Sequence, residues 1–278
     1  MPELPEVETV VRYLRPRVTA ARVAEVHVRR ADLRYPVPVD AVLALQGCEI
    51  TGVHRRAKYV LFDFTERTVL VHLGMSGRLF IEPSMGQPWE KHEHWRWHLD
   101  GPNGDGPHLL RYIDARRFGA LDVFENEAET RHPLLERLGP EPLGPLWTPT
   151  VLLEACAGRT TAIKQLLMDG HIIVGVGNIY ASETCFRAAT HPLRPAGTLS
   201  AAECERLVAA SRSVLQDAID AGGSTLKDFV GGDAAPGYFQ QQLDVYGRQG
   251  QRCHRCSGLV GHCSLGGRAT YFCGGCQA

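Results

Sequence analysis

The sequence lacks the features that mark several common classes of protein. No apolar run approaches the ~20 residues that a transmembrane helix needs. The first residues, MPELPEVETVV, are acidic and have neither the basic start nor the apolar core of a secretory signal. The nine cysteines cannot all pair, and four of them form a metal-binding pattern, so a disulfide framework is not expected. We therefore expect a cytoplasmic protein.

An excess of positive charge is also missing, since the net charge is −1. Lysine is scarce, with four residues against 26 arginines. Affinity for phosphate depends on local basic surface and not on the average over the chain. The last 35 residues, from Asp244 onward, carry four arginines against one aspartate. A nucleic-acid partner is therefore not excluded.

The hydrophobic pattern changes twice along the chain and predicts an α+β protein. Apolar residues at helical spacing follow Pro5 and predict an N-terminal helix. Between about residues 22 and 125, short β-branched runs separated by turns predict two packed sheets. Helical spacing returns after residue 150, where Ser200 and Glu203 form a capping box at the start of one helix.

These changes divide the chain into four parts. We expect an N-terminal β-sandwich domain at residues 1–134 and a linker rich in proline and glycine at 135–150. A helical domain should follow at residues 151–240. The cysteine-rich tail should occupy residues 241–278.

The tail holds two Cys-x2-Cys pairs separated by sixteen residues: Cys253 with Cys256 and Cys273 with Cys276. Two such pairs facing each other across a hairpin supply the four soft ligands that Zn²⁺ prefers. The intervening LGGRAT predicts a tight turn, with Arg268 at or near its tip. Three other residues are alternative ligands at less suitable spacings: His254, His262 and Cys263. Four protein ligands close the coordination sphere, so we predict one structural Zn²⁺ and no catalytic metal.

The N-terminus offers a candidate nucleophile. Removal of the initiator methionine would leave Pro2 with a secondary amine. An α-amino group has a pKa of about 8, against about 10.4 for lysine, so more of it is neutral and nucleophilic at pH 7. Glu3 is adjacent and Glu6 lies three residues further on, which brings carboxylates within reach for proton transfer. Taken alone, these residues more often mark an ordinary helix start.

Sequence blocks along the whole chain resemble the bacterial formamidopyrimidine-DNA glycosylase (Fpg/MutM) family. They occur in one order: MPELPEVETV, RRAKY, HLGMSGRL, EKHEH, RRFGAL, GPEPL, GVGNIYASE, THPLRPA, STLKDF, PGYF, VYGR and the zinc tail. Several blocks are long and chemically unusual, which makes a chance match remote. The opening PELPEVET resembles this branch and not the related endonuclease VIII branch.

The resemblance implies a fold and an activity. The fold would be an N-terminal helix with a two-layer β-sandwich, a helix-two-turns-helix domain and a zinc-ribbon hairpin. The activity would be that of a monomeric, bifunctional glycosylase and abasic-site lyase of base excision repair. Its partner would be damaged double-stranded DNA at the bacterial nucleoid, and its substrates 8-oxoguanine and formamidopyrimidines.

The resemblance also implies a role for each matching residue. Pro2 would attack C1′ of the damaged nucleotide and form a Schiff base, with Glu3 as acid and base at the sugar. Lys58 would assist β-elimination, while Arg268 would contact phosphate and assist δ-elimination. Phosphate-side contacts are implied for His92, Arg159, Lys164, Asn178 and Arg268.

Base flipping explains the remaining roles, because an enzyme that acts at the glycosidic bond must take the base out of the stack. Three residues would fill the gap that the flipped nucleotide leaves: Met75, Arg116 and Phe118. Three others would recognise the lesion: Glu6, Lys227 and Tyr238. The loop from about Lys227 to Tyr238 would close over the extruded base.

Three positions depart from the family pattern. Ala115 stands where proline is usual, which loosens the turn that presents Arg116 and Phe118. Thr160 replaces a basic residue, and the lesion loop reads GGDAAPG. None of these changes removes a chemical group from the mechanism.

Three other functions fit parts of the sequence. They are an oxidised-pyrimidine glycosylase on the same scaffold, a non-catalytic DNA-binding homologue, and a tautomerase that uses Pro2 as a base. The presence of Pro2, Glu3 and Lys58 argues against a non-catalytic protein. A tautomerase would explain neither the zinc tail nor the chain length.

Overall fold

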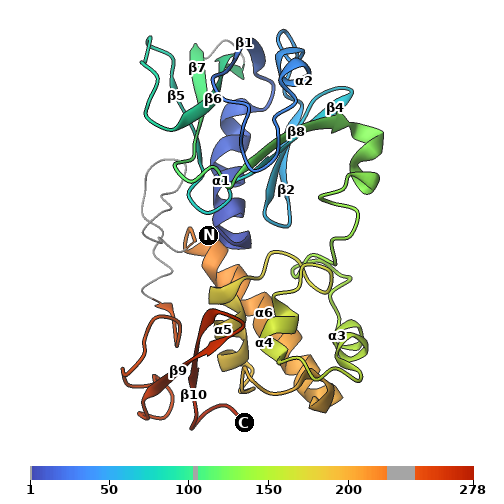
Figure 1. The fold of residues 1–278 in the computed structure, drawn as a ribbon, viewed down its shortest axis with the longest axis vertical. Coiled ribbons are helices and arrows are strands. Elements are labelled where there is room, and N and C mark those ends of the chain that lie inside the picture. Colours follow the sequence, from blue (N-terminus) through green and yellow to red (C-terminus); the bar gives the residue numbers. More distant parts are fainter. Residues whose placement is uncertain (1, 103–105, 224–241) are drawn as a thin grey trace. The chain divides into compact units, whose positions relative to one another are not determined.

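The computed structural model describes residues 2–102, 106–223 and 242–278. These residues form two compact units (Figure 1). The first contains the chain up to Glu136 together with Gly222 and Gly223. The second contains Arg137–Ala221 together with the described residues from 242 onward.

The first unit begins with the helix α1 (Leu4–Val18). Pro5 suits the first turn of a helix, where its missing N–H would have no intrahelical acceptor. The N–H of Glu3, the residue before the helix, donates to Oε2 of Glu6 at 2.8 Å. Apolar side chains at three- and four-residue intervals are buried: Val7, Val10, Val11, Leu14 and Val18. The predicted N-terminal helix is confirmed.

Two four-stranded antiparallel sheets follow α1. The first has the order β1–β6–β7–β5, with bounds β1 (Arg22–Val28), β6 (Glu93–Asp100), β7 (Pro107–Ile113) and β5 (Arg78–Pro83). The second has the order β2–β3–β4–β8, with bounds β2 (Gly52–Arg56), β3 (Tyr59–Asp63), β4 (Arg67–His72) and β8 (Ala120–Glu125). Two short helices border the sheets: α2 (Val39–Leu43) and the 3₁₀ helix η2 (Asn126–Arg131).

One apolar core joins α1 and both sheets. Trp97 of the first sheet meets the ring of Phe62 of the second edge-on, at 5.5 Å between ring centroids. Trp95 stacks on Tyr112 within the first sheet, at 5.3 Å. The sheets therefore pack face to face as a two-layer sandwich, as the sequence predicts.

The second unit is helical. Its elements are α3 (Pro149–Cys156), α4 (Ile163–Leu167), α5 (Asn178–Arg187), η3 (Ala196–Thr198) and α6 (Ala201–Asp220). The predicted capping box is present, since Oε2 of Glu203 accepts the Ser200 N–H at 2.8 Å and Oγ of Ser200 accepts the Glu203 N–H at 3.4 Å. Trp147, from the segment predicted to be a linker, is fully buried and donates Nε1–H to Oγ of Ser211.

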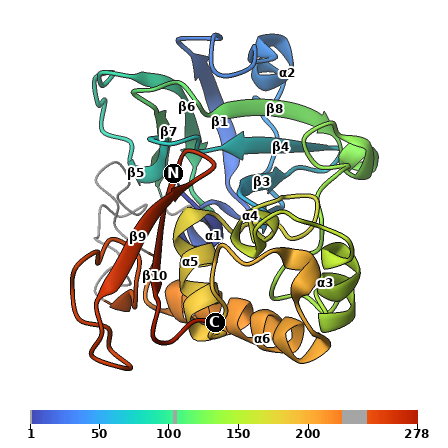
Figure 2. The ribbon, with the colours of Figure 1, turned by 60° about the horizontal axis from the view of Figure 1, so that its bottom comes forward.

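A β-hairpin of β9 (Val260–Leu265) and β10 (Arg268–Cys273) completes this unit. Strand β10 packs against α5 (Figure 2). The buried carboxylate of Glu183 on α5 accepts three backbone N–H groups from residues 244–246, at 2.8 to 3.0 Å. This arrangement attaches the chain that leads to the hairpin to α5. Among the described residues, none of the helices is both long and apolar enough to cross a membrane.

Candidate functional site

Three of the predicted residues gather at the start of α1. Pro2, Glu3 and Glu6 are all buried. The positive end of the helix dipole stabilises carboxylates at this position. Gly223 adopts φ +79° and lies against Glu6, so that an added Cβ would be 3.4 Å from Oε1 of Glu6. Lys227 and Tyr238, the other predicted lesion-recognition residues, lie outside the described residues.

Lys58 occupies a two-residue turn between β2 and β3. Its neighbour Ala57 has φ +53°, a left-handed conformation that costs a non-glycine residue about 1 kcal/mol or more. Arg55 supports this turn, because its Nη1 donates to the Ala57 carbonyl at 2.9 Å and its Nε to Oε2 of Glu8 at 3.0 Å. Glu8 belongs to α1. The Lys58 turn is therefore attached to the helix that begins after Pro2 and Glu3.

Met75 and Phe118 lie on two turns that connect the sheets. The Met75 turn (residues 73–77) joins β4 to β5, and the Phe118 turn (residues 114–119) joins β7 to β8. Phe118 is 44% exposed, and the Arg116 guanidinium lies 5.0 Å from the centre of its ring. A Cβ added to Gly74 would lie 2.4 Å from the Phe118 carbonyl carbon. The two turns are thus in backbone contact.

Asp114 connects the two turns and is fully buried. Its Oδ1 accepts the hydroxyl of Ser76 at 2.6 Å and the N–H of Arg116 at 3.2 Å. Its Oδ2 accepts the N–H of Gly119 at 2.8 Å and the hydroxyl of Tyr112 at 3.3 Å. Asp114 is not among the residues that the sequence predicts for the site.

His72 lies at the end of β4, beside both turns. Its Nδ1 accepts the N–H of Gly74 at 3.2 Å, and its ring also hydrogen-bonds the backbone of Phe118. Burial, with the positive charges of Lys58 and Arg34, lowers the pKa of His72 to about 4. The imidazole is therefore neutral at pH 7 and free to accept the Gly74 N–H.

His92 borders a basic pocket of about 390 Å³ in the first unit. It is exposed, with φ +66°. Four other cationic residues line the pocket: Arg29, Arg30, Lys91 and Arg117. The one carboxylate in the lining, that of Glu93, is buried and paired with Arg111. Arg30 and Arg117 each pair with Asp32, which offsets part of this positive charge. The local surface is still more basic than the net charge of the chain indicates.

Two of the predicted phosphate contacts of the second unit, Lys164 and Asn178, meet between α4, α5 and β10. Nζ of Lys164 donates to Oδ1 of Asn178 at 2.6 Å, to Oγ1 of Thr270 at 2.7 Å and to the Ala269 carbonyl at 3.1 Å. Lys164 is only 1% exposed. Arg268 is exposed at the start of β10, directly after the Gly266–Gly267 turn, which confirms its predicted place at the hairpin tip. Arg159 is exposed in the turn after α3.

The four tail cysteines form a compact cluster, with all Sγ atoms within 4.8 Å of one another. The Sγ atoms of Cys253 and Cys276 are 3.8 Å apart, and those of Cys256 and Cys273 are 3.4 Å apart. Tetrahedral Zn²⁺ with bonds of ~2.3 Å needs sulfur separations of ~3.8 Å, so the cluster fits this metal. His254, an alternative ligand in the sequence, instead lies 3.3 Å from the Asp244 carboxylate.

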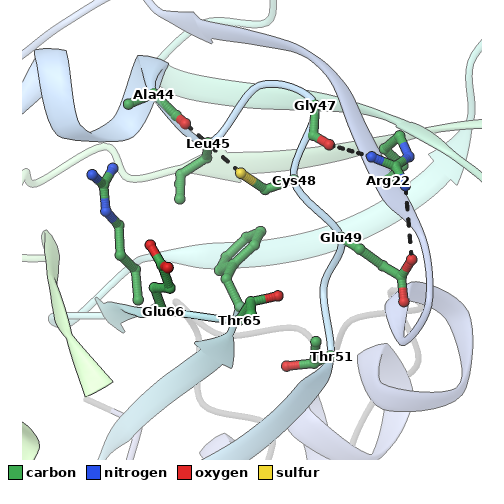
Figure 3. A pocket seen from close by; sticks show the side chains of 11 residues that line it. Arg22, Ala44, Leu45, Gly47, Cys48, Glu49, Thr51, Thr65 and Glu66 are labelled. Atoms are coloured by element: carbon green, nitrogen blue, oxygen red, sulfur yellow. Dashed lines mark hydrogen bonds and ion pairs between the residues drawn. The ribbon is translucent and has the colours of Figure 1, made fainter. Parts of the chain in front are cut away.

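A separate pocket of about 570 Å³ in the first unit contains none of the predicted residues (Figure 3). Its lining carries charges of both signs, and Arg22 pairs with Glu49 at 4.0 Å. It has no group suited to the predicted chemistry. The candidate site residues of the first unit therefore lie around α1 and the three turns, and those of the second unit lie around α4, α5 and the hairpin.

Known proteins share this organisation. The family profile described as Formamidopyrimidine-DNA glycosylase N-terminal domain matches residues 1–121, and the profile described as Formamidopyrimidine-DNA glycosylase H2TH domain matches residues 138–230. The chain is 51% identical over 278 residues to the formamidopyrimidine-DNA glycosylase of Laribacter hongkongensis, covering all of both chains. The chain belongs to the formamidopyrimidine-DNA glycosylase family.

Solved structures of family members are similar over the full length. The MutM (Fpg) protein of Thermus thermophilus has a TM-score of 0.86 at 37% identity, covering 99% of this chain and 98% of that one. The Lactococcus lactis Fpg, solved with DNA that contains N7-benzyl-Fapy-dG, has a TM-score of 0.89 at 29% identity, covering 99% of both chains. The family fold therefore extends over both units of this formamidopyrimidine-DNA glycosylase.

Three supporting residues of this family member were not predicted: Glu8, Arg55 and Asp114. Asp114 accepts a hydrogen bond from the N–H of the predicted residue Arg116. Glu8 and Arg55 support the turn that carries Lys58. A signal was present, since Arg55 and Asp114 stand in or beside the family blocks RRAKY and RRFGAL. Only the structure shows which groups they connect.

Proposed function

We propose that this formamidopyrimidine-DNA glycosylase removes oxidised purines from duplex DNA and then cleaves the strand at the resulting abasic site. Family membership over the full chain makes it a DNA glycosylase of base excision repair. The observation that carries the chemistry is the start of α1, where Pro2 and Glu3 lie next to each other and the Lys58 turn is attached to the same helix.

The reaction begins at the N-terminus. Once Met1 has been removed, the amine of Pro2 attacks C1′ of the extruded nucleotide while the base departs, and a Schiff base forms. Glu3 exchanges protons with the sugar, since a positioned carboxylate is an effective acid and base. Lys58 assists β-elimination, and Arg268 assists δ-elimination at the second phosphate.

Extrusion and phosphate binding complete the proposal. Met75, Phe118 and Arg116 enter the stack on the two connected turns and offset the cost of unstacking, which is about a few kcal/mol. His92, Arg159, Asn178 and Arg268 bind phosphates, and the buried ammonium of Lys164 orients Asn178 and β10. Glu6, Lys227 and Tyr238 recognise the lesion.

The metal has a structural role in this proposal. Cys253, Cys256, Cys273 and Cys276 would hold one Zn²⁺, which fixes the hairpin. The protein would act as a monomer on damaged chromosomal DNA at the bacterial nucleoid, because its substrate is found there.

Borohydride trapping on a duplex with 8-oxoguanine opposite cytosine tests the function. The protein should form a covalent adduct, and mass spectrometry should find the DNA on residue 2. Pro2→Gly retains only a primary amine and should reduce excision and trapping severely.

Three results would contradict the assignment. DNA attached to Lys58 would remove Pro2 from the role of nucleophile. Faster excision of thymine glycol than of 8-oxoguanine would indicate an oxidised-pyrimidine glycosylase. Absence of any adduct would indicate a non-catalytic DNA-binding protein.

A further inference from the structure

The Met75 turn and the Phe118 turn depend on one buried carboxylate. Asp114 accepts a hydroxyl hydrogen bond from Ser76 on the first turn and two N–H hydrogen bonds from Arg116 and Gly119 on the second. Hydrogen bonds to an ionised acceptor are about twice as strong as neutral ones. A single group therefore joins two turns that come from strands far apart in the sequence.

The space around this carboxylate permits little movement. A Cβ on Gly119 would lie 1.7 Å from the Tyr112 hydroxyl, and one on Gly77 would lie 2.3 Å from the Leu73 carbonyl oxygen. The Tyr112 hydroxyl bonds both Asp114 and the His72 carbonyl. The two turns consequently behave as one unit.

We infer that Asp114 is the positioning residue that fixes Met75 and Phe118 relative to each other before DNA enters. This inference rests on the proposed function. Ala115 lacks the φ restraint that a proline gives, and the hydrogen bonds of Asp114 to the backbone on either side of Arg117 supply that restraint instead. Asp114 touches neither substrate nor reacting atoms in this role.

Asp114→Asn tests the inference with little change in size. The amide places N–H donors where two donors already point, so the turns should lose their fixed spacing. Single-turnover excision of 8-oxoguanine from duplex DNA should slow by about tenfold to a hundredfold, the rate change for one lost charge-assisted hydrogen bond. Cleavage of a pre-formed abasic site needs less unstacking and should change less than about threefold.

Three further variants separate positioning from general stability. Ser76→Ala removes one hydrogen bond between the turns. It should also slow 8-oxoguanine excision more than abasic-site cleavage, but by a smaller factor than Asp114→Asn. Ala115→Pro added to Asp114→Asn should restore part of the excision rate. Asp63→Asn, which alters a hydrogen-bonded carboxylate elsewhere in the unit, should leave both rates unchanged. Equal losses on both substrates, or no rescue by proline, would overturn the inference while leaving the glycosylase function intact.

A second, independent observation concerns three side chains on the exposed face of the first sheet. Glu25 and His27 are two residues apart on β1, and His98 is paired with Glu25 on β6, so all three lie on one face. Oε2 of Glu25 is 3.1 Å from Nε2 of His27. One ligand atom from each residue lies within 4.8 Å of the others.

The surroundings prepare His98 as a ligand. Its Nδ1 is 3.2 Å from Oγ of Ser84, a contact that leaves Nε2 for a metal, and such contacts with the second ring nitrogen are usual around metal sites. Arg96 shares this face, but its guanidinium stacks 3.8 Å from the Trp89 ring centre and pairs with Glu93.

We propose that Glu25, His27 and His98 bind one divalent transition-metal ion of the Zn²⁺ or Ni²⁺ type. Two imidazoles and a carboxylate are a donor set that such ions favour. Ligand atoms around Zn²⁺ are about 3.3 Å apart when bonds are about 2.0 Å, so small side-chain rotations would close the site. Water would complete the coordination, because Glu25 and His27 are exposed.

Isothermal titration of the zinc-loaded protein with Ni²⁺ tests this second site. We expect one further equivalent to bind, and metal analysis should show one ion more than the four-cysteine cluster holds. His27→Ala and His98→Ala should each abolish that equivalent. His171→Ala removes an exposed histidine of the other unit and should retain it. Binding that persists in the double variant His27→Ala/His98→Ala, or no further equivalent in the wild type, would refute the site.

Discussion

At the scale of a single residue, the hydrogen bond between His72 and Gly74 depends on the protonation state of His72. Its neutral ring accepts the Gly74 N–H, and a proton on Nδ1 would break that bond. Lys58 and Arg34 oppose a further positive charge there, whereas the Asp114 carboxylate favours it. Burial is the largest cause of the lowered pKa. The Gly74 N–H of the Met75 turn therefore has this acceptor only while Nδ1 of His72 is unprotonated.

The lowered pKa of His72 predicts how the free energy of unfolding depends on pH. The pKa of His72 is about 4 in the folded protein and about 6.5 in an unfolded chain. Between these values the unfolded state binds more protons, so the contribution of His72 is complete above about pH 6.5 and is lost as the pH falls towards 4. His72→Gln should reduce the fall in Tm over this range, measured by thermal unfolding against pH. If the Tm of His72→Gln falls with pH as steeply as that of the wild type, this role of His72 is contradicted.

At the scale of elements, the hairpin of β9 and β10 and the helix α5 depend on each other. Lys164, Asn178 and the β10 backbone share one hydrogen-bond network, and Glu183 binds the chain that precedes the hairpin. Arg268 projects from the strand that this network holds. Loss of the metal should therefore displace Arg268, a predicted phosphate contact, although the side chain of Arg268 itself is unchanged.

Cys256→Ser tests this dependence. Removal of one thiolate should weaken the metal site and unfold the hairpin, while the β-sandwich unit keeps its structure, because metal binding and folding are coupled in such small motifs. DNA affinity should fall, and its dependence on salt should become shallower as Arg268 loses its position. Cys263→Ser, outside the cluster, is the control and should behave as the wild type. Undiminished DNA affinity in a verified zinc-free protein would disprove the coupling.

Whether the sequence predicts an interaction depends on how far apart in the chain its residues lie. Helices, strands and cysteine pairs arise from local spacing, and α1, the two sheets and the hairpin were predicted for this reason. The Ser76–Asp114 and Glu8–Arg55 contacts join residues 38 and 47 positions apart, so no local pattern contains them. The resemblance implies that Lys164 contacts phosphate, yet its side chain is buried and its ammonium bonds Asn178 and Thr270 from two other elements.

At the scale of the whole molecule, the proposed function assigns extrusion of the base and chemistry at the sugar to different residues. Pro2, Glu3 and Lys58 lie around the start of α1, whereas Met75 and Phe118 lie on turns between the two sheets. If the turns act before any bond breaks, their variants should slow excision from intact duplex more than cleavage of an abasic site. Asp114 should then act only through these turns.

A double-mutant cycle tests whether Asp114 affects excision through Phe118. Phe118→Ala should slow 8-oxoguanine excision, because it removes the apolar contact that offsets unstacking. Asp114→Asn, which acts by placing Phe118, should add little once that ring is absent, so the two losses should be strongly non-additive. Glu3→Gln changes the chemical step. When it is combined with Phe118→Ala, the fold loss in rate should equal the product of the two single losses. Single-turnover rates of the wild type, the three single variants and the two double variants give both interaction energies. Additive losses for Phe118 and Asp114 would mean that Asp114 supports the site by another route.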